Sequence, residues 1–333
     1  MIRFGINLLP DGPTVVEEVK LAEACGFDFA TFVDSELLWM DVYAILTLCA
    51  NQTRKVQLGP GVTNPYTRHP AVTASAIATI DELSGGRAIL GIGRGDSAVR
   101  TLGFEPVKGQ TLKEYVEVCR RLTAGETVTY KGKPITLRWA KRRIPVDVAA
   151  SGPRTLALSG EIGDAVTMLV GANPGLIRWG MENVRRGAEA AGRKMEEIKL
   201  GAYVGCFVSD DLKKARDEVR GVAAAIINLY ARDRHVKVED LPPEIVEEIP
   251  QIRDRYRYSE HLDSSAAHAL PLTDRLIDKV AIIGPAEVCR ERLQQLADCG
   301  LQHLCLFLLP IQRREDREQV MRAVAEAVFP HLK

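Results

Sequence analysis

Several side chains that could take part in chemistry come directly after apolar runs of this chain. Asn7 ends the first run, Asp34 and Ser35 follow the second, and Asp96 follows the fourth. Carboxylate, amide and hydroxyl groups at such positions can orient a substrate or move a proton. Their spacing does not match a metal site, a serine-hydrolase elbow or the paired carboxylates of a glycosidase. We therefore expect a site that positions its reactants and uses one proton-handling group.

Two glycine-rich stretches leave the backbone bare near these residues. The stretch 58–70, LGPGVTNPYTRHP, holds two Gly, three Pro and one Asn, so its backbone can approach a flat or bent ligand. Taken alone, such a stretch is more often an ordinary strand-to-helix loop, and the repeated strand-and-helix units around it favour the ligand interpretation. In GIGRGD at 91–96 the third glycine comes one position too early for the dinucleotide fingerprint, which argues against a nicotinamide-binding Rossmann domain. This motif indicates either a rim kept bare at Gly93 or a tight turn.

A third candidate site is the sequence ASGPR at 150–154, which precedes a helix expected over 155–162. Free N–H groups and the positive end of the helix dipole at Gly152 suit a phosphate, and Arg154 would add charge. The alternative is a capped helix, with Ser151 as the cap and Pro153 as the first helical residue. The sequence leaves both interpretations open.

The chain repeats one strand-and-helix unit. Eight apolar runs are each followed by a helical pattern, and their lack of polar alternation is typical of strands buried on both faces. The runs cover 3–8, 29–33, 56–62, 88–93, 145–150, 165–170, 200–208 and 303–309. This alternation predicts a (β/α)₈ TIM barrel, in which the candidate residues share the rim at the C-terminal strand ends. An open doubly wound sheet is the alternative fold.

We expect a single domain over 1–333 with two insertions. The first, near 125–140, contains a hairpin pattern at 127–137, and the second, near 232–272, is polar and interrupted by proline. The chain has 44 basic and 44 acidic residues, which lacks the basic surface of a nucleic-acid binder. It has no apolar run long enough for a membrane span, and its seven scattered cysteines are typical of a reduced, cytoplasmic protein.

The motifs together resemble a known family. The segments 59–70, 74–84 and 86–93 are similar to the bacterial luciferase-like flavin and deazaflavin oxidoreductases, and within them most similar to the methylene-tetrahydromethanopterin reductases. Further matches are GEIGD at 160–164 and GAEAAGR at 187–193. The resemblance is strong over 55–96 and weak over 232–272.

This resemblance implies a barrel that forms a homodimer or larger homo-oligomer and binds coenzyme F420 or FMN. It implies a non-prolyl cis peptide between Gly61 and Val62, behind the middle ring of the cofactor. The cofactor phosphate would lie near Ser151, Gly152 and Pro153. Further cofactor contacts would come from Asp34, Thr63, Asn64, Gly93 and Gly171.

Two positions depart from the relatives. Deazaflavin-using relatives usually carry Asp-His where this chain has Asp34-Ser35, and the pterin reductases end their first strand with Glu where this chain has Asn7. Trp39 matches a wall of the substrate pocket in the deazaflavin-dependent sugar-phosphate dehydrogenases, and Asp96 matches an acid of those enzymes.

Our first hypothesis is hydride transfer between coenzyme F420 and a small organic substrate. In it, Asp96 handles the proton while Asn7 and Ser35 orient the reactants. The alternatives are an FMN-dependent monooxygenase on the same fold and a flavin- or deazaflavin-binding protein without turnover. Tighter binding of the deazaflavin than of FMN follows from the first hypothesis.

Overall fold

The protein forms two compact units. A computed structural model describes residues 2–233, 235–253, 255–308 and 313–332. The first unit comprises 1–6, 150–161 and 166–333, and the second comprises 7–149 and 162–165. Strand β1 (Arg3–Leu8) crosses from the first unit into the second.

The second unit alternates strands and helices along the chain. Its strand β2 pairs in parallel with β3, and β4 pairs in parallel with β7, with Gly91 opposite Asp147. Single parallel bridges join Leu58 to Ala88 and Thr63 to Ile92. Its elements are α1 (Val15–Ala24), β2 (Phe29–Phe32), α2 (Val42–Gln52), β3 (Gln57–Pro60), α3 (Pro70–Ser84), β4 (Leu90–Ile92), α4 (Ser97–Thr101), α5 (Gly109–Thr123), β5 (Thr127–Tyr130), β6 (Lys133–Thr136) and β7 (Val146–Ala150).

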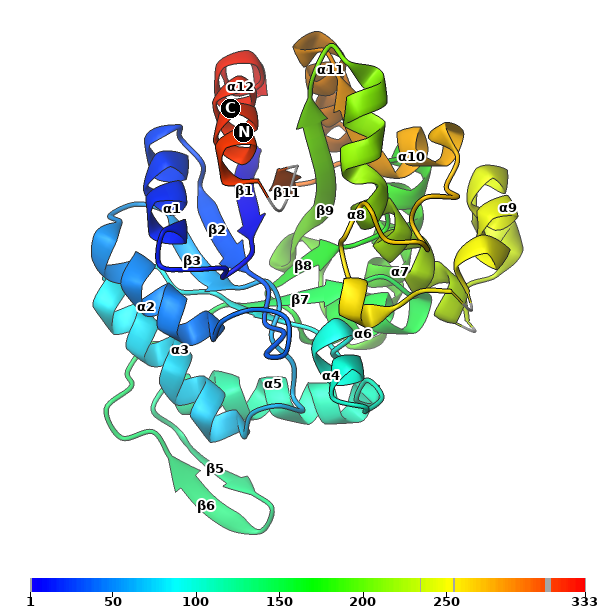
Figure 1. The fold of residues 1–333 in the computed structure, drawn as a ribbon. Coiled ribbons are helices and arrows are strands. Elements are labelled where there is room, and N and C mark those ends of the chain that lie inside the picture. The colour runs from blue at the N-terminus through cyan, green and yellow to red at the C-terminus, as the bar shows by residue number, and fades with distance from the viewer. Residues whose placement is uncertain (1, 234, 254, 309–312, 333) are drawn as a thin grey trace. The chain divides into compact units, whose positions relative to one another are not determined.

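The first unit is built around β9, whose ten residues are almost all buried. It pairs in parallel with β11 and β10, and β11 pairs in parallel with β1. Helices α8, α9 and α10 belong to this unit, and α8 contacts both of the others (Figure 1). Its elements are α6 (Pro153–Ile162), β8 (Ala165–Met168), α7 (Pro174–Ala190), β9 (Lys199–Val208), α8 (Leu212–Arg232), α9 (Pro243–Ile252), α10 (Asp274–Val280), β10 (Ala281–Gly284), α11 (Ala286–Ala297), β11 (His303–Leu308), α12 (Arg314–Ala327) and α13 (Phe329–Leu332), with 3₁₀ turns at Met195–Glu197, Val238–Asp240 and Tyr258–Glu260.

Local sequence explains the helix that follows the glycine-rich stretch 58–70. His69 caps α3 by accepting a hydrogen bond from the Ala71 N–H at 3.2 Å, and Pro70 is the first helical residue. Pro suits this position because its missing N–H would have no helical partner. Gly85 ends the helix with φ 71°, a left-handed conformation that glycine adopts without a side-chain clash. The stretch is therefore fixed at its C-terminal end by a well-formed helix.

All eight predicted apolar runs contain a strand, but the strands are shorter than several of the runs. β2 ends at Phe32, β3 ends at Pro60, and β4 begins at Leu90. Proline has no N–H for the sheet, so β3 stops where the glycine-rich loop begins. Leu309, the predicted end of the last run, lies outside the described residues. Strand β10 was not predicted, because its four residues AIIG are too short to separate from the end of a helix.

The predicted hairpin in the first insertion is confirmed. β5 and β6 pair antiparallel, and they reach away from α5 in the second unit (Figure 1). Lys131 and Gly132 form the turn with φ 48° and 79°. The second insertion holds α9 and two 3₁₀ turns, and α9 begins at Pro243. None of the described helices is long and apolar enough to cross a membrane.

Candidate functional site

Asn7 joins the ends of three strands in the second unit. Its Nδ2 donates to Thr31 Oγ1 and to the Gly61 carbonyl oxygen, each at 2.9 Å. The side chain is 6% exposed, and its Oδ1 forms no hydrogen bond within the described part of the chain. Asn7 therefore holds the glycine-rich loop against β2 and keeps one acceptor for another group.

The loop after β3 contains the cis peptide bond that the resemblance implied, between Gly61 and Val62. A Cβ atom on Gly61 would collide with Asn7 and lie 2.6 Å from Thr31, so only glycine fits. Thr63 N–H donates to the Gly91 carbonyl at 3.0 Å, and Gly93 N–H donates to the Thr63 carbonyl at 2.9 Å. These bonds bring Gly93 beside the loop, where a Cβ would lie 3.2 Å from Val62.

Thr63 and Asn64 present unpaired groups from this loop. Asn64 Oδ1 accepts hydrogen bonds from the backbone N–H groups of Tyr66 at 2.9 Å and Thr67 at 3.1 Å. Its Nδ2 and the Thr63 hydroxyl are buried and form no hydrogen bond with the described residues. The backbone is thus rigidly held while one donor and one hydroxyl stay available.

Asp34 lies buried after β2, with 3% of its surface exposed. Burial raises the pKa of its carboxyl to about 6, and the neighbouring Thr63 and Arg68 only partly oppose this. Arg68 Nη2 is 3.9 Å from Asp34 Oδ1, which is longer than a good hydrogen bond. Asp34 Oδ2 has no hydrogen-bond partner among the described residues.

Arg68 is held beside Asp34 by two other side chains, which sequence reasoning missed. Its Nη2 donates to Asp41 Oδ2 at 2.7 Å, and its guanidinium lies 4.8 Å from the centre of the Tyr43 ring. Hydrogen bonding to Asp41 and the nearby carboxylates outweigh burial and raise the pKa of Arg68. Arg68 lies within the conspicuous loop sequence, but Asp41 looks like a helix cap, and indeed it accepts from Ala44 N–H at 2.9 Å.

The other predicted site residues of the second unit are Ser35, Asp96 and Trp39, and each forms a hydrogen bond within the protein. Ser35 Oγ is 2.8 Å from Ser97 Oγ, which links the end of β2 to the start of α4. Asp96 precedes α4 and accepts from Arg100 Nε at 3.1 Å, with 32% of its side chain exposed. Trp39 is half-buried, and its backbone N–H donates to the Ser35 carbonyl at 3.0 Å. Asp96 is thus a charge-compensated carboxylate, unlike Asp34.

Buried side-chain polar atoms without a hydrogen bond concentrate at the end of β1, in the loops after β2 and β3, and at Tyr43 of α2. Eight of the thirteen buried side-chain polar atoms without a hydrogen bond in the described residues belong to segment 7–68. We call these residues the strand-end cluster: Asn7, Asp34, Glu36, Tyr43, Thr63, Asn64, Thr67 and Arg68. A buried polar group without a partner costs about 1–3 kcal/mol, so such a concentration fits a site that a polar ligand completes.

The predicted phosphate site lies in the first unit. α6 begins at Pro153, directly after Ser151 and Gly152, so the expected helix N-terminus is present. A Cβ on Gly152 would collide with the carboxylate of Asp233, which therefore stands close to this backbone. Gly171 has φ 88°, and a Cβ there would lie 3.3 Å from Val280. Both glycines permit close backbone approach, and Asp233 is a neighbour that the sequence did not reveal.

The described residues contain no group of three or more His, Cys, Asp or Glu side chains that could hold a metal ion. None of the seven cysteines forms a disulfide. The strand-end cluster instead offers an amide oxygen, an amide nitrogen, hydroxyls and a carboxyl around a bare glycine-rich loop. This donor set fits the edge of a heteroaromatic ring that carries carbonyl and N–H groups.

Residues 7–303 match the family model described as luciferase-like monooxygenase. The chain belongs to this family. It is 34% identical to 5,10-methylenetetrahydromethanopterin reductase of Archaeoglobus fulgidus, and the similarity covers 100% of both chains. It is 28% identical to the F420-dependent glucose-6-phosphate dehydrogenase of Amycolatopsis mediterranei, over 91% of this chain and 99% of the relative.

The structure of the coenzyme F420 dependent tetrahydromethanopterin reductase from Methanopyrus kandleri is also similar. It superposes with a TM-score of 0.77 at 29% identity, over 100% of this chain and 99% of that chain. The family resemblance and the (β/α)₈ TIM barrel predicted from the sequence are thereby confirmed. The alternative of an open doubly wound sheet is wrong.

Proposed function

We propose that this protein is an oxidoreductase that transfers hydride between coenzyme F420 and a small organic substrate. The observation that carries the proposal is the strand-end cluster, in which Asn7 contacts Gly61, and Thr63 and Asn64 directly follow the cis peptide bond between Gly61 and Val62. Relatives named as F420-dependent enzymes, at 28–29% identity over nearly the whole chain, support this choice of cofactor.

The bound coenzyme supplies a ring carbon that gives or takes a hydride. Gly61, Val62 and Gly93 would hold one face of its ring, because none of them carries a polar side chain. Asn7 Oδ1, Thr63 Oγ1 and Asn64 Nδ2 would hold its polar edge. Each of these atoms is buried now, so exclusion of bulk water strengthens the contacts that the ring makes.

The phosphate of the coenzyme binds in our proposal at Ser151, Gly152 and Pro153, with Gly171 giving room for the tail. The N-terminus of α6 provides N–H groups and a positive dipole end for an anion. Asp233 adjoins Gly152, so its carboxylate turns away when the phosphate arrives. This movement is required because two anions repel at such a separation.

Three residues act on the substrate side. Asp96 exchanges a proton with the substrate, Ser35 orients the substrate with help from its bond to Ser97, and Trp39 forms a wall of the pocket. Asp96 accepts a hydrogen bond from Arg100, so in our proposal a substrate group replaces that contact before a proton is exchanged.

The first substrate to test is methylenetetrahydromethanopterin, the compound in the name of the relative with 34% identity. Asn7 replaces the Glu that the resemblance leads us to expect there, and Ser35 replaces a His, so two ionisable groups are missing from the site. Proton transfer in this chain must therefore use other carboxyls. Glucose 6-phosphate is the second substrate to test, because Trp39 matches the sugar-phosphate dehydrogenases.

The decisive experiment measures oxidation of the reduced coenzyme with methylenetetrahydromethanopterin and reduction of the oxidised coenzyme with glucose 6-phosphate. Each is measured with and without oxygen. Reduced FMN reacts quickly with O₂, whereas the reduced deazaflavin is nearly inert to it. We expect substrate-dependent oxidation of reduced coenzyme F420 at the same rate in air and under nitrogen. Oxidation that needs both FMN and O₂ would replace the proposal by an FMN-dependent monooxygenase, and binding without any turnover would indicate a storage protein.

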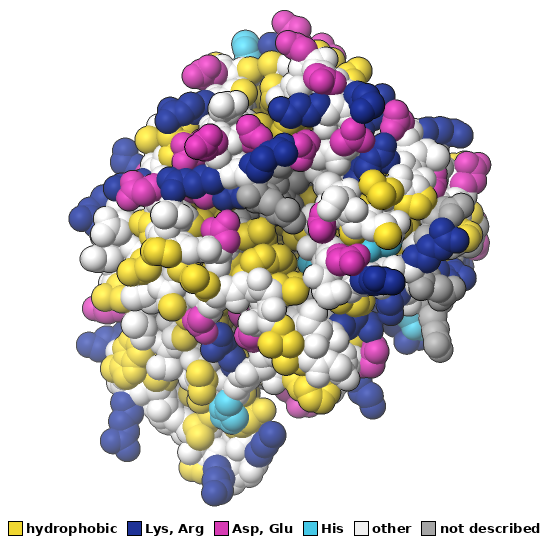
Figure 2. Space-filling model, viewed as in Figure 1, with side chains coloured by type: hydrophobic (Ala, Val, Ile, Leu, Met, Phe, Trp, Pro, Cys, Tyr) yellow, Lys and Arg dark blue, Asp and Glu magenta, His cyan; other side chains and the backbone are white. Residues whose placement is uncertain are grey.

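The protein forms a homodimer or larger homo-oligomer in our proposal. Leu48 of α2 and Val72 and Leu83 of α3 are 46%, 53% and 50% exposed, and α2 packs on α3. Figure 2 shows hydrophobic side chains over this part of the second unit. A cytoplasmic location and a single domain over 1–333, with its two insertions, complete the proposal. Sedimentation at micromolar concentration tests the oligomer: a monomer would exclude it.

A further inference from the structure

We propose that Asp34 exchanges the proton of the coenzyme ring during hydride transfer, and that Arg68 is a positioning residue which sets its protonation. This inference rests on the proposed function, because it assigns a role within the same site. It differs from the role of Asp96, which exchanges a proton with the substrate. The geometry that carries it is a buried carboxyl oxygen without a hydrogen bond, next to the loop residues Thr63 and Arg68.

The proton balance of the reaction requires two groups. The reduced coenzyme carries two hydrogens more than the oxidised form. One leaves as hydride, so a ring C–H bond breaks and a C–H bond forms on the substrate. Asp34, as a carboxylate, accepts the second hydrogen as a proton. Asp96 takes up a proton from solvent once the substrate has displaced Arg100, and it gives that proton to the substrate. Solvent then restores both carboxyls, so atoms and charge balance without a further reactant.

Asp34 suits this role better than Asp96 or Asp41. Asp96 accepts a hydrogen bond from Arg100, and Asp41 is bound by Arg68. Asp34 alone among these three is almost fully buried and keeps an oxygen unpaired within the described residues. A general acid–base group works best when its pKa lies near the working pH, and burial brings the pKa of Asp34 to about 6.

The charges around Asp34 set its proton affinity in opposite directions. Glu36 and Asp41 raise the pKa of Asp34, whereas Arg68 and the Thr63 hydroxyl lower it. Tyr43 stays neutral because burial raises the pKa of its hydroxyl. Asp41 also holds Arg68 at 3.9 Å from Asp34, so it limits how far the guanidinium lowers the pKa. Arg68 therefore lowers the pKa of Asp34, and its hydrogen bond to Asp41 limits that effect.

The first test needs no coenzyme. The ¹³C signal of the Asp34 carboxyl, assigned by its loss in Asp34→Asn, is followed by NMR from acidic to mildly alkaline pH. We expect wild-type Asp34 to titrate near the value of about 6. Arg68→Met removes a positive charge and should raise the midpoint, whereas Asp41→Asn should lower it. Arg216→Met, in the other unit, is the matched control and should leave it unchanged.

The second test asks whether Asp34 faces the coenzyme. The dissociation constant of oxidised coenzyme F420 is measured by fluorescence between about pH 5 and pH 8. If the coenzyme changes the pKa of Asp34, its affinity changes by about tenfold for each unit of that change. We expect this dependence in wild type and in Asp96→Asn, and its loss in Asp34→Asn.

The outcomes separate the two proposals. Failure of wild type to bind coenzyme F420 at any pH would reject the proposed function. Binding that is independent of pH, or that keeps its pH dependence in Asp34→Asn, would overturn the role of Asp34 alone. An Asp34 signal that titrates near the usual aspartate value and ignores Arg68→Met would overturn it as well.

Discussion

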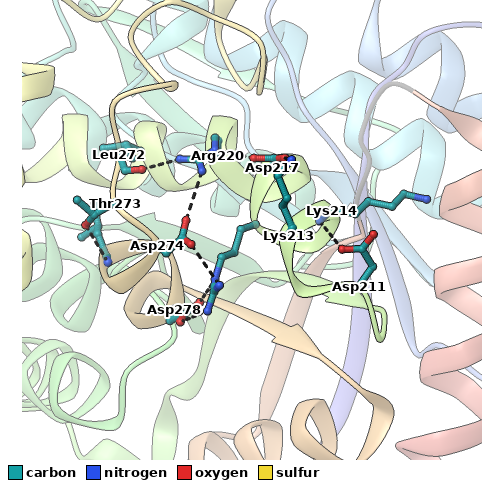
Figure 3. Close-up of polar contacts among 11 residues, drawn as sticks. Asp211, Lys213, Lys214, Asp217, Arg220, Leu272, Thr273, Asp274 and Asp278 are labelled. Atoms are coloured by element: carbon teal, nitrogen blue, oxygen red, sulfur yellow. Dashed lines mark hydrogen bonds and ion pairs between the residues drawn. The ribbon is translucent and has the colours of Figure 1, made fainter.

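Polar groups are paired differently in two regions of the molecule. These regions are the strand-end cluster of the second unit and the charged face between α8 and α10 of the first unit. Between α8 and α10, Arg216 bonds to Asp278 at 2.9 and 3.1 Å and to Asp274 at 3.2 Å. Arg220 bonds to Asp217 and to the Leu272 carbonyl (Figure 3). We call these residues the α8–α10 network. In the strand-end cluster, by contrast, buried polar atoms lack partners among the described residues.

The comparison distinguishes polar groups that stabilise the fold from polar groups that are available to a ligand. Asp274 and Asp278 are about half exposed, so their pairing with Arg216 adds little stability beyond what water already offers. The strand-end atoms are buried and unpaired, so the folded protein is less stable than it would be with partners. A sequence keeps such a cost where a ligand offsets it. The predictions below test this contrast.

The largest effect should come from Gly61→Ala. The new methyl group would collide with Asn7 and Thr31, which form the buried bond at the end of β1. We expect a loss of about 3 kcal/mol in the free energy of unfolding, from overpacking, together with loss of coenzyme binding. Urea denaturation and fluorescence titration measure both. Wild-type stability in this variant would show that the cluster is loosely packed.

Asn7→Ala should have the next largest effect. It leaves the Gly61 carbonyl and the Thr31 hydroxyl without the hydrogen bonds that Asn7 Nδ2 donates. We expect a loss of about 2 kcal/mol in stability and a weaker affinity for the coenzyme. Asn7→Asp keeps the size of the side chain and serves as a control for packing. An unchanged affinity in Asn7→Ala would remove Asn7 from the cofactor site.

Asp34→Asn should change how stability depends on pH. The folded-state pKa of about 6 lies above the ordinary value of 3.8, so the folded protein holds the Asp34 proton more tightly than the unfolded chain does. The stability that this proton provides is complete below pH 3.8. This contribution is lost as the pH rises through the folded pKa. Relative to Asp34→Asn, wild type should therefore lose about 1.5 kcal/mol of unfolding free energy between about pH 5 and pH 8. Parallel stability curves for the two proteins would contradict a raised pKa.

The smallest effect should come from Arg216→Met in the α8–α10 network. Its partners are exposed, so we expect a loss of less than about 1 kcal/mol in stability, further reduced at high salt. Coenzyme affinity should equal that of wild type. A loss of affinity in this variant would mean that the contrast between the two regions does not separate structure from function.

The sequence predicted the barrel and the family because both depend on patterns that lie close together along the chain. Among the described residues, the apolar runs predicted eight of the eleven strands, and the turn at Lys131 and Gly132 predicted the hairpin of β5 and β6, so only β10 was missed. The loop at Gly61 was predicted from the glycine and proline content of residues 58–70. Its cis peptide came from the family resemblance and is present.

The pairing of side chains could not be predicted, since it depends on contacts between residues distant along the chain. Arg68 and Asp41 are 27 residues apart, and each has an ordinary local interpretation. The weak ion pair of Asp34 Oδ1 with Arg68 at 3.9 Å, and the lack of a hydrogen bond at Oδ2 among the described residues, are not revealed by any spacing in the sequence. Likewise, the neighbour of Gly152 proved to be Asp233, at the end of α8. The assignments of Asp96, Ser35 and Trp39 stay predictions.

The central claim is that the strand-end cluster of the second unit is completed by a deazaflavin. The most direct measurement is an equilibrium fluorescence titration of oxidised coenzyme F420 and of FMN against the protein, with Asn7→Ala and Arg216→Met in parallel. We predict a dissociation constant for coenzyme F420 about tenfold or more below that for FMN, which corresponds to about 1.4 kcal/mol. Asn7→Ala should weaken it, and Arg216→Met should not. A protein that purifies yellow with stoichiometric FMN and does not bind the deazaflavin would contradict the account.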